Sequence, residues 1–134
     1  MKRLLLTLLI PVLSSCALVD AYLMTKYDAN EYRIITEIRA DAMSYKSQCT
    51  DATASARNAH VIADKTQLFE FYNQHIPRNN NGIRASHNLN EIAQGLKKRY
   101  ESGTPVSATF CRIKFEGIEI AASTIQNVVG NRPR

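Results

Sequence analysis

Apolar and small residues recur along the first half of the chain at alternating steps of four and three, the spacing of one helix face. No glycine or proline interrupts residues 12–76, so the pattern fits one helix from about Asp28 to His75, or two helices with a turn near residues 48–51. We favour two, because Thr50 or Asp51 can cap the second helix, whereas a single helix of that length would need a partner along all of it. The recurring residues are Ile34, Ile38, Ala42, Tyr45, Cys49, Ala52, Ala56, Ala59 and Ala63.

Pro77 ends this helical region, since proline disfavours a helical conformation in the residue before it. The next stretch, Arg78-Asn79-Asn80-Asn81-Gly82, is predicted to be a loop because Asn and Gly tolerate turn conformations. Ser86 is the expected N-cap of a third helix. The apolar face of that helix would carry Leu89, Ile92, Leu96 and Tyr100.

The sequence Ser102-Gly103-Thr104-Pro105 predicts a boundary. Gly103 can close the third helix, and Thr104 can cap a fourth with Pro105 at its first position. The expected core seam of that helix is Val106, Phe110, Ile113, Gly117, Ile120, Thr124 and Val128. Residues 111–116 also alternate apolar and charged, which is a strand pattern; we favour helix because of the length and the cap. Gly130 would end it, leaving residues 131–134 as a loose basic tail.

These elements predict an all-α fold, a small up-down bundle of about four helices near residues 19–47, 52–76, 86–101 and 105–129. We expect a helical domain over residues 31–130. No internal repeat or low-complexity linker divides it.

The first 16 residues form an export leader. Lys2 and Arg3 precede a run from Leu4 to Leu13 that is apolar except for one threonine. Ten residues span about 15 Å as a helix, half of a bilayer core, so the run fits a signal peptide and not a membrane span. An ordinary secretory signal cleaved nearby is one interpretation. The other rests on the four residues Leu13-Ser14-Ser15-Cys16.

Leu13-Ser14-Ser15-Cys16 resembles the lipobox of bacterial lipoproteins. The resemblance implies cleavage of residues 1–15, attachment of diacylglycerol and an N-acyl chain (palmitate) to Cys16, and a tether over residues 16–30. Because the next residue, Ala17, is not aspartate, it also implies transfer to the outer membrane, with the domain in the periplasm. The lipid would be the only non-protein group, and no other cofactor is expected.

Removing residues 1–15 from the 134-residue chain leaves 119 residues, enough for one small domain, and lowers the net charge from +5 to +3. This mild charge, without a basic stripe interleaved with aromatic residues, argues against a nucleic-acid partner. Cys49 and Cys111 are the remaining cysteines. In an oxidising compartment we expect them to form a disulfide; two buried thiols are the alternative.

Candidate catalytic residues are scarce. His60, His75 and His87 include no pair at helical ligand spacing, and no zinc, phosphate-loop or nucleophile-elbow motif is present. Carboxylates one turn apart, such as Asp28 and Glu31, usually mark a solvated helix face. We therefore expect that the protein is not an enzyme, binds no metal ion and has no small-molecule substrate.

The expected activity is contact with another envelope protein. Loops held between helices carry function more often than helix faces do. The candidate partner-binding loop therefore contains Arg78, Asn79, Asn80, Asn81 and Arg84.

Beyond the lipobox, two stretches resemble type II secretion pilotins, which are small outer-membrane lipoproteins with a helical bundle and one long-range disulfide. The stretches are Tyr45-Lys46-Ser47-Gln48-Cys49 and residues 99–105, followed by Cys111. The resemblance implies binding of a helical tail of a secretin subunit in a groove. The alternative is a phage- or plasmid-encoded envelope lipoprotein, for superinfection or entry exclusion or as an outer-membrane spanin subunit. A spanin would favour the single long helix.

Overall fold

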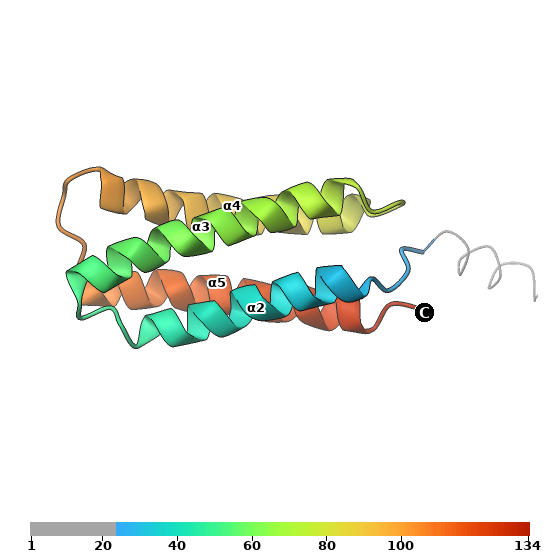
Figure 1. The fold of residues 1–134 in the computed structure, drawn as a ribbon, viewed down its shortest axis with the longest axis horizontal. Helices are drawn as coiled ribbons and strands as arrows, with labels where there is room; N and C mark the ends of the chain where they lie inside the picture. The colour runs from blue at the N-terminus through green and yellow to red at the C-terminus, as the bar shows by residue number, and fades with distance from the viewer. Residues whose placement is uncertain (1–23) are drawn as a thin grey trace, which may run out of the picture.

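The computed structural model describes residues 24–134, which fold into four helices joined by short turns (Figure 1). The helices run up and down in chain order, so the predicted all-α up-down bundle is confirmed. α2 packs most extensively on α5, and α3 on α4, which gives two antiparallel pairs in two layers. The helices are α2 (Ala29–Lys46), α3 (Ala52–Gln74), α4 (Asn80–Glu101) and α5 (Ala108–Gly130).

Side-chain caps fix where three of the helices begin. Asp28 accepts a hydrogen bond from the backbone N–H of Glu31 at 2.8 Å, and Asp51 accepts two at 2.9 Å. The Asp51 cap confirms two helices in place of one. The predicted start of the first helix near residue 19 is wrong for residues 24–28, which are not helical because Asp28 begins the helix; residues 19–23 lie outside the described part.

The boundaries of the last two helices differ from prediction. α4 begins at Asn80 and not near Ser86, which is buried inside the helix. The predicted loop thus shrinks to a turn in which Arg78 takes a φ of 59°. Gly103, with a φ of 73°, follows α4 as predicted. The cap of α5 is Ser107, which accepts from Phe110 N at 3.1 Å, and not Thr104.

The region after residue 107 is helical, so the strand alternative is wrong. The predicted seam of α5 is also wrong, because Ile113, Ile120 and Val128 are each about 60% exposed. A different face of the same helix supplies the core. Its buried residues are Cys111, Phe115, Ile118, Ala122 and Val129.

The predicted disulfide is confirmed. Cys49, in the α2–α3 turn, bonds to Cys111 in the first turn of α5, with a Cα–Cα distance of 5.7 Å. The bridge closes one end of the bundle. The α3–α4 turn, the approach to α2 and the carboxyl terminus meet at the other end (Figure 1). None of the helices within residues 24–134 is long and apolar enough to cross a membrane.

Candidate functional site

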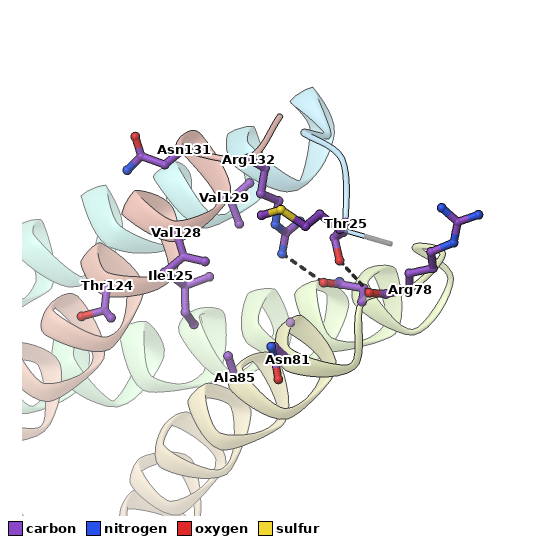
Figure 2. Close-up of a pocket in the computed structure, with 13 residues that line it drawn as sticks. Thr25, Arg78, Asn81, Ala85, Thr124, Ile125, Val128, Val129, Asn131 and Arg132 are labelled. Carbon is purple, nitrogen blue, oxygen red and sulfur yellow. Dashed lines mark hydrogen bonds between the residues drawn. The ribbon is translucent and has the colours of Figure 1, made fainter. Parts of the chain in front are cut away.

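A cleft of about 630 Å³ lies at the end of the bundle opposite the disulfide, between the start of α4 and the end of α5 (Figure 2). Ala85 of α4 and Ile125, Val128 and Val129 of α5 form its apolar wall, and Met24 closes one side. No acidic residue of the described part, residues 24–134, lines it. Such a concave apolar surface with a few polar groups is the usual form of a binding site.

Three separate segments meet at the cleft end of the bundle: the approach to α2, the α3–α4 turn and the carboxyl-terminal tail. Thr25, before α2, donates through Oγ1 to the carbonyl oxygen of Arg78 in the α3–α4 turn at 2.6 Å. The N–H of Tyr27 donates to the carbonyl oxygen of Pro133 at 2.8 Å. The guanidinium of Arg134 lies over the ring of Tyr27 at 4.9 Å. These contacts show that the predicted loose tail, residues 131–134, is instead packed on the bundle end.

A buried polar network supports the cleft from below. Nη1 of Arg132 forms an ion pair with Oε2 of Glu31, and the two side chains are 9% and 0% exposed. Nη2 of Arg132 donates to Oδ1 of Asn79 at 3.0 Å. Nδ2 of Asn79 then donates to Oδ1 of Asn73 at 2.7 Å. The network joins α2, the end of α3, the turn before α4 and the tail, so it fixes the position of both cleft walls.

Burial raises the pKa of the Glu31 carboxyl above its ordinary value of 4.5, and the Arg132 guanidinium opposes this rise only in part. Oε1 of Glu31 is buried without a hydrogen-bond partner among the described residues. Removal of the cation would therefore leave a charge in an apolar environment, which is costly. The expectation that Asp28 and Glu31 mark a solvated face is wrong, since Asp28 caps α2 and Glu31 is part of the core.

The structure divides the residues of the predicted partner-binding loop between two roles. Arg78, Asn79 and Asn81 line the cleft, but the side chain of Asn79 is buried and bonded within the network. Asn80 and Arg84 belong to the first turns of α4, where Nη2 of Arg84 donates to Oδ1 of Asn81 at 2.8 Å. The predicted binding loop is thus one rim of a cleft, and no long loop is present there.

Sequence reasoning missed the other half of the cleft. Thr124 and Val128 were predicted to lie in the core seam of the last helix, whereas they line the cleft. Their four-residue spacing shows that they share a face of the helix, but it does not show whether that face is buried or exposed. Arg132 and Glu31 carried no local signal, because they are 101 positions apart. Cys16 and the leader lie outside the described residues.

Within residues 24–134 no group of three His, Cys, Asp or Glu side chains has the arrangement of a metal site. Nδ1 of His87 donates to Oε1 of Glu70 at 2.8 Å, and this bond raises the pKa of His87. Comparisons with protein-family models, curated proteins and solved structures give no match to this chain.

Proposed function

We propose that this chain is a lipoprotein, held at the outer membrane through acyl chains on Cys16, that binds a helical apolar segment of another cell-envelope protein in the cleft between α4 and α5. The proposal combines the lipobox at residues 13–16 with the apolar cleft at the membrane-anchored end of the bundle. Catalysis has no part in it.

The observation that carries the proposal is the apolar surface of α5. Ile113, Ile120 and Val128 are spaced seven and eight residues apart and are 59–60% exposed, and Val128 also lines the cleft. Exposed apolar surface that continues into a pocket is typical of protein-binding sites. A helix with anchors about two turns apart would match this spacing, as in other helix-in-groove complexes.

Small residues give such a helix room to approach. A Cβ atom built on Gly117 of α5 or on Gly95 of α4 would meet nothing within 4 Å. Gly117 lies between Ile113 and Ile120 in the same stripe. Close approach of two helices needs small residues at the crossing point, and Gly117 supplies one.

The proposed anchor would hold the cleft near the membrane. Met24 at the cleft is eight positions after Cys16, and a fully extended chain of eight residues spans at most about 29 Å. The disulfide is at the far end of the bundle. A partner segment bound in the cleft would therefore be held close to the outer membrane, as the pilotin-like role requires.

The intrachain bridge also favours a pilotin-like accessory over a spanin. A spanin would favour one long helix and dimers, whereas Cys49–Cys111 closes a compact antiparallel bundle within one chain. The exclusion functions of phage or plasmid lipoproteins remain a second proposal that shares the anchor and the protein contact.

The test combines the anchor with the cleft. We expect wild-type protein to incorporate labelled palmitate in cells and Cys16→Ser to incorporate none. Crosslinking in the native envelope should capture one envelope protein with wild type and with Met43→Asp, a control for the half-exposed Met43 of α2. Val128→Asp should lose that protein. Labelling of Cys16→Ser, or equal capture by both aspartate variants, would contradict the proposal.

A further inference from the structure

A second pocket, of about 370 Å³, lies between α2 and α5, the two helices that pack most extensively on one another (Figure 1). It shares only Asn131 with the cleft. Its lining is polar and contains no acidic residue of the described part, residues 24–134. Pockets of this size bind small molecules. The lining residues are Tyr32, Arg39, Ser123, Gln126, Asn127, Gly130 and Asn131.

Arg39 of α2 is the only charged residue that residues 24–134 place in this lining. Its Nη1 donates to Oε1 of Gln126 at 3.0 Å, but its Nε is buried without a hydrogen-bond partner among the described residues. Arg39 also belongs to none of the ion pairs found within residues 24–134. A buried unpaired donor on a permanent cation is costly, so this guanidinium favours an anionic acceptor.

Gln126 holds the guanidinium and a nearby hydroxyl in place. Its Nε2 donates to Oγ1 of Thr36 at 2.8 Å and to the hydroxyl oxygen of Tyr32 at 3.4 Å, which orients the amide so that Oε1 faces Arg39. Gly130 lets the Tyr32 ring lie against α5, since a Cβ atom there would be 3.1 Å from that ring. The contacts between the two helices therefore form the pocket without the help of a ligand.

The other polar groups of the lining are available as donors. The hydroxyl of Ser123 and Nδ2 of Asn127 make no hydrogen bond with a described residue, and the Tyr32 O–H, which accepts from Gln126, donates to none. Oδ1 of Asn127 accepts from Asn131 at 3.3 Å, which leaves Nδ2 to donate elsewhere. Ser123 and Asn127 are four residues apart and share one face of α5.

This donor set suits phosphate better than carboxylate. Arginine is the preferred cation for phosphate because its planar donors match two phosphate oxygens. A phosphate ester has further oxygens that point in other directions, and these can accept from hydroxyl and amide groups on the second helix. A carboxylate has only two oxygens, and both lie in one plane.

We propose that the pocket between α2 and α5 binds a phosphate group, with Arg39 as its counter-charge and Tyr32, Ser123 and Asn127 as hydrogen-bond donors. The group belongs either to a soluble phosphate ester or to the headgroup of an anionic phospholipid, and the chemistry of recognition is the same for both. The site is independent of the proposed function, because it uses a different pocket and needs no partner protein.

The test is an NMR titration of the full chain, purified from cells in a non-ionic detergent, with inorganic phosphate, glycerol 3-phosphate and acetate at constant ionic strength. We expect both phosphates to give saturating shifts of the Arg39 side-chain N–H resonances and of the backbone amides of residues 123–127. Arg39→Gln should weaken phosphate binding about tenfold or more, because charge-assisted hydrogen bonds are lost. Arg33→Gln removes the same charge from a 61% exposed side chain of α2 and should change binding less than twofold.

A second variant and a second ligand complete the design. Asn127→Asp adds a negative charge to the lining at an exposed position and should also weaken phosphate binding about tenfold; circular dichroism melting shows that each variant is folded. Phosphatidylglycerol added to the detergent micelles identifies the source of the phosphate. Binding tighter than that of glycerol 3-phosphate supports a lipid headgroup, and equal or weaker binding supports a soluble ester.

Four results would overturn the inference. They are the absence of a saturating shift, equal weakening by Arg39→Gln and Arg33→Gln, wild-type phosphate binding by folded Asn127→Asp, and binding of acetate as tight as that of phosphate. Because no partner protein is present, these results are separate from a failure to capture an envelope protein.

Discussion

Removal of the Arg132 cation should destabilise the bundle more than the loss of any exposed ion pair. In Arg132→Met the Glu31 carboxylate, 0% exposed, keeps its charge in the core without a counter-ion. One of its oxygens already lacks a partner among the described residues, and Asn79 loses a 3.0 Å bond as well. Breaking a buried pair from one side costs about 3–5 kcal/mol.

Urea and thermal unfolding followed by circular dichroism measure this cost. For a domain of about this size, 3–5 kcal/mol corresponds to a fall of about 12–30 °C in the midpoint temperature. The loss should shrink at acidic pH. Without the cation the folded pKa of Glu31 lies further above 4.5. Its penalty is therefore absent below pH 4.5, grows as pH rises from 4.5 toward the folded pKa, and is complete above the folded pKa.

Two further variants make the prediction refutable. The double variant Arg132→Met/Glu31→Gln should recover about 2 kcal/mol or more, because the uncompensated charge is gone. Arg33→Met breaks the exposed Arg33–Glu37 pair, whose side chains are 61% and 48% exposed, and should cost less than about 0.5 kcal/mol. A cost for Arg132→Met that equals that of Arg33→Met, or no recovery in the double variant, would refute the reasoning.

Three other predictions test the rest of the fold. Cys49→Ser should lower the free energy of unfolding by about 4 kcal/mol, because the bridge closes a 62-residue separation; chemical denaturation checks this. Gly82→Ala should lower the free energy of unfolding, since its Cβ would meet the Asn79 side chain at 2.2 Å. Gly95→Ala should raise the free energy of unfolding by about 0.5–1 kcal/mol, because its Cβ would point into open space; chemical denaturation checks both. The raised pKa of His87 means that its pair with Glu70 stabilises fully below pH 6.5 and is lost as pH rises through the folded pKa; His87→Gln should remove this part of the pH dependence of thermal midpoints.

The helical bundle was predictable because its determinants are local. Asp51 caps α3 through its own neighbours, and Gly103 takes the positive φ that glycine favours at the end of a helix. The pairing of Cys49 with Cys111 followed from the presence of two cysteines in a domain that the leader sequence predicts to be exported. Each of these needs only a few residues of sequence.

The errors have a different physical origin. The start of α4 depends on Asn79, whose side chain is held by Arg132, 53 residues away, so turn chemistry alone could not place it. α5 is apolar on two faces, and helical periodicity fits both. The predicted disulfide could have identified the buried face, because it requires Cys111 to point into the bundle. Phe115 and Ile118 lie on the same face of α5 as Cys111.

One wall of the candidate site was predictable from local sequence and the other was not. Arg78 and Asn81 stood out as turn residues, and the structure places both on the rim. The α5 wall, with Ile125 and Val128, becomes visible only when the inward face of that helix is known. Tertiary contacts decide which apolar stripe remains exposed for a partner.

The most direct test of the account is site-specific photo-crosslinking of the lipidated protein in its native envelope, with the crosslinker at Val128 or Ala85 in the cleft or at Met43 on α2. We predict that both cleft positions capture the same envelope protein, joined through one apolar helical segment, and that position 43 does not. Capture of the same proteins from all three positions, or of none from the cleft, would contradict a partner-binding cleft.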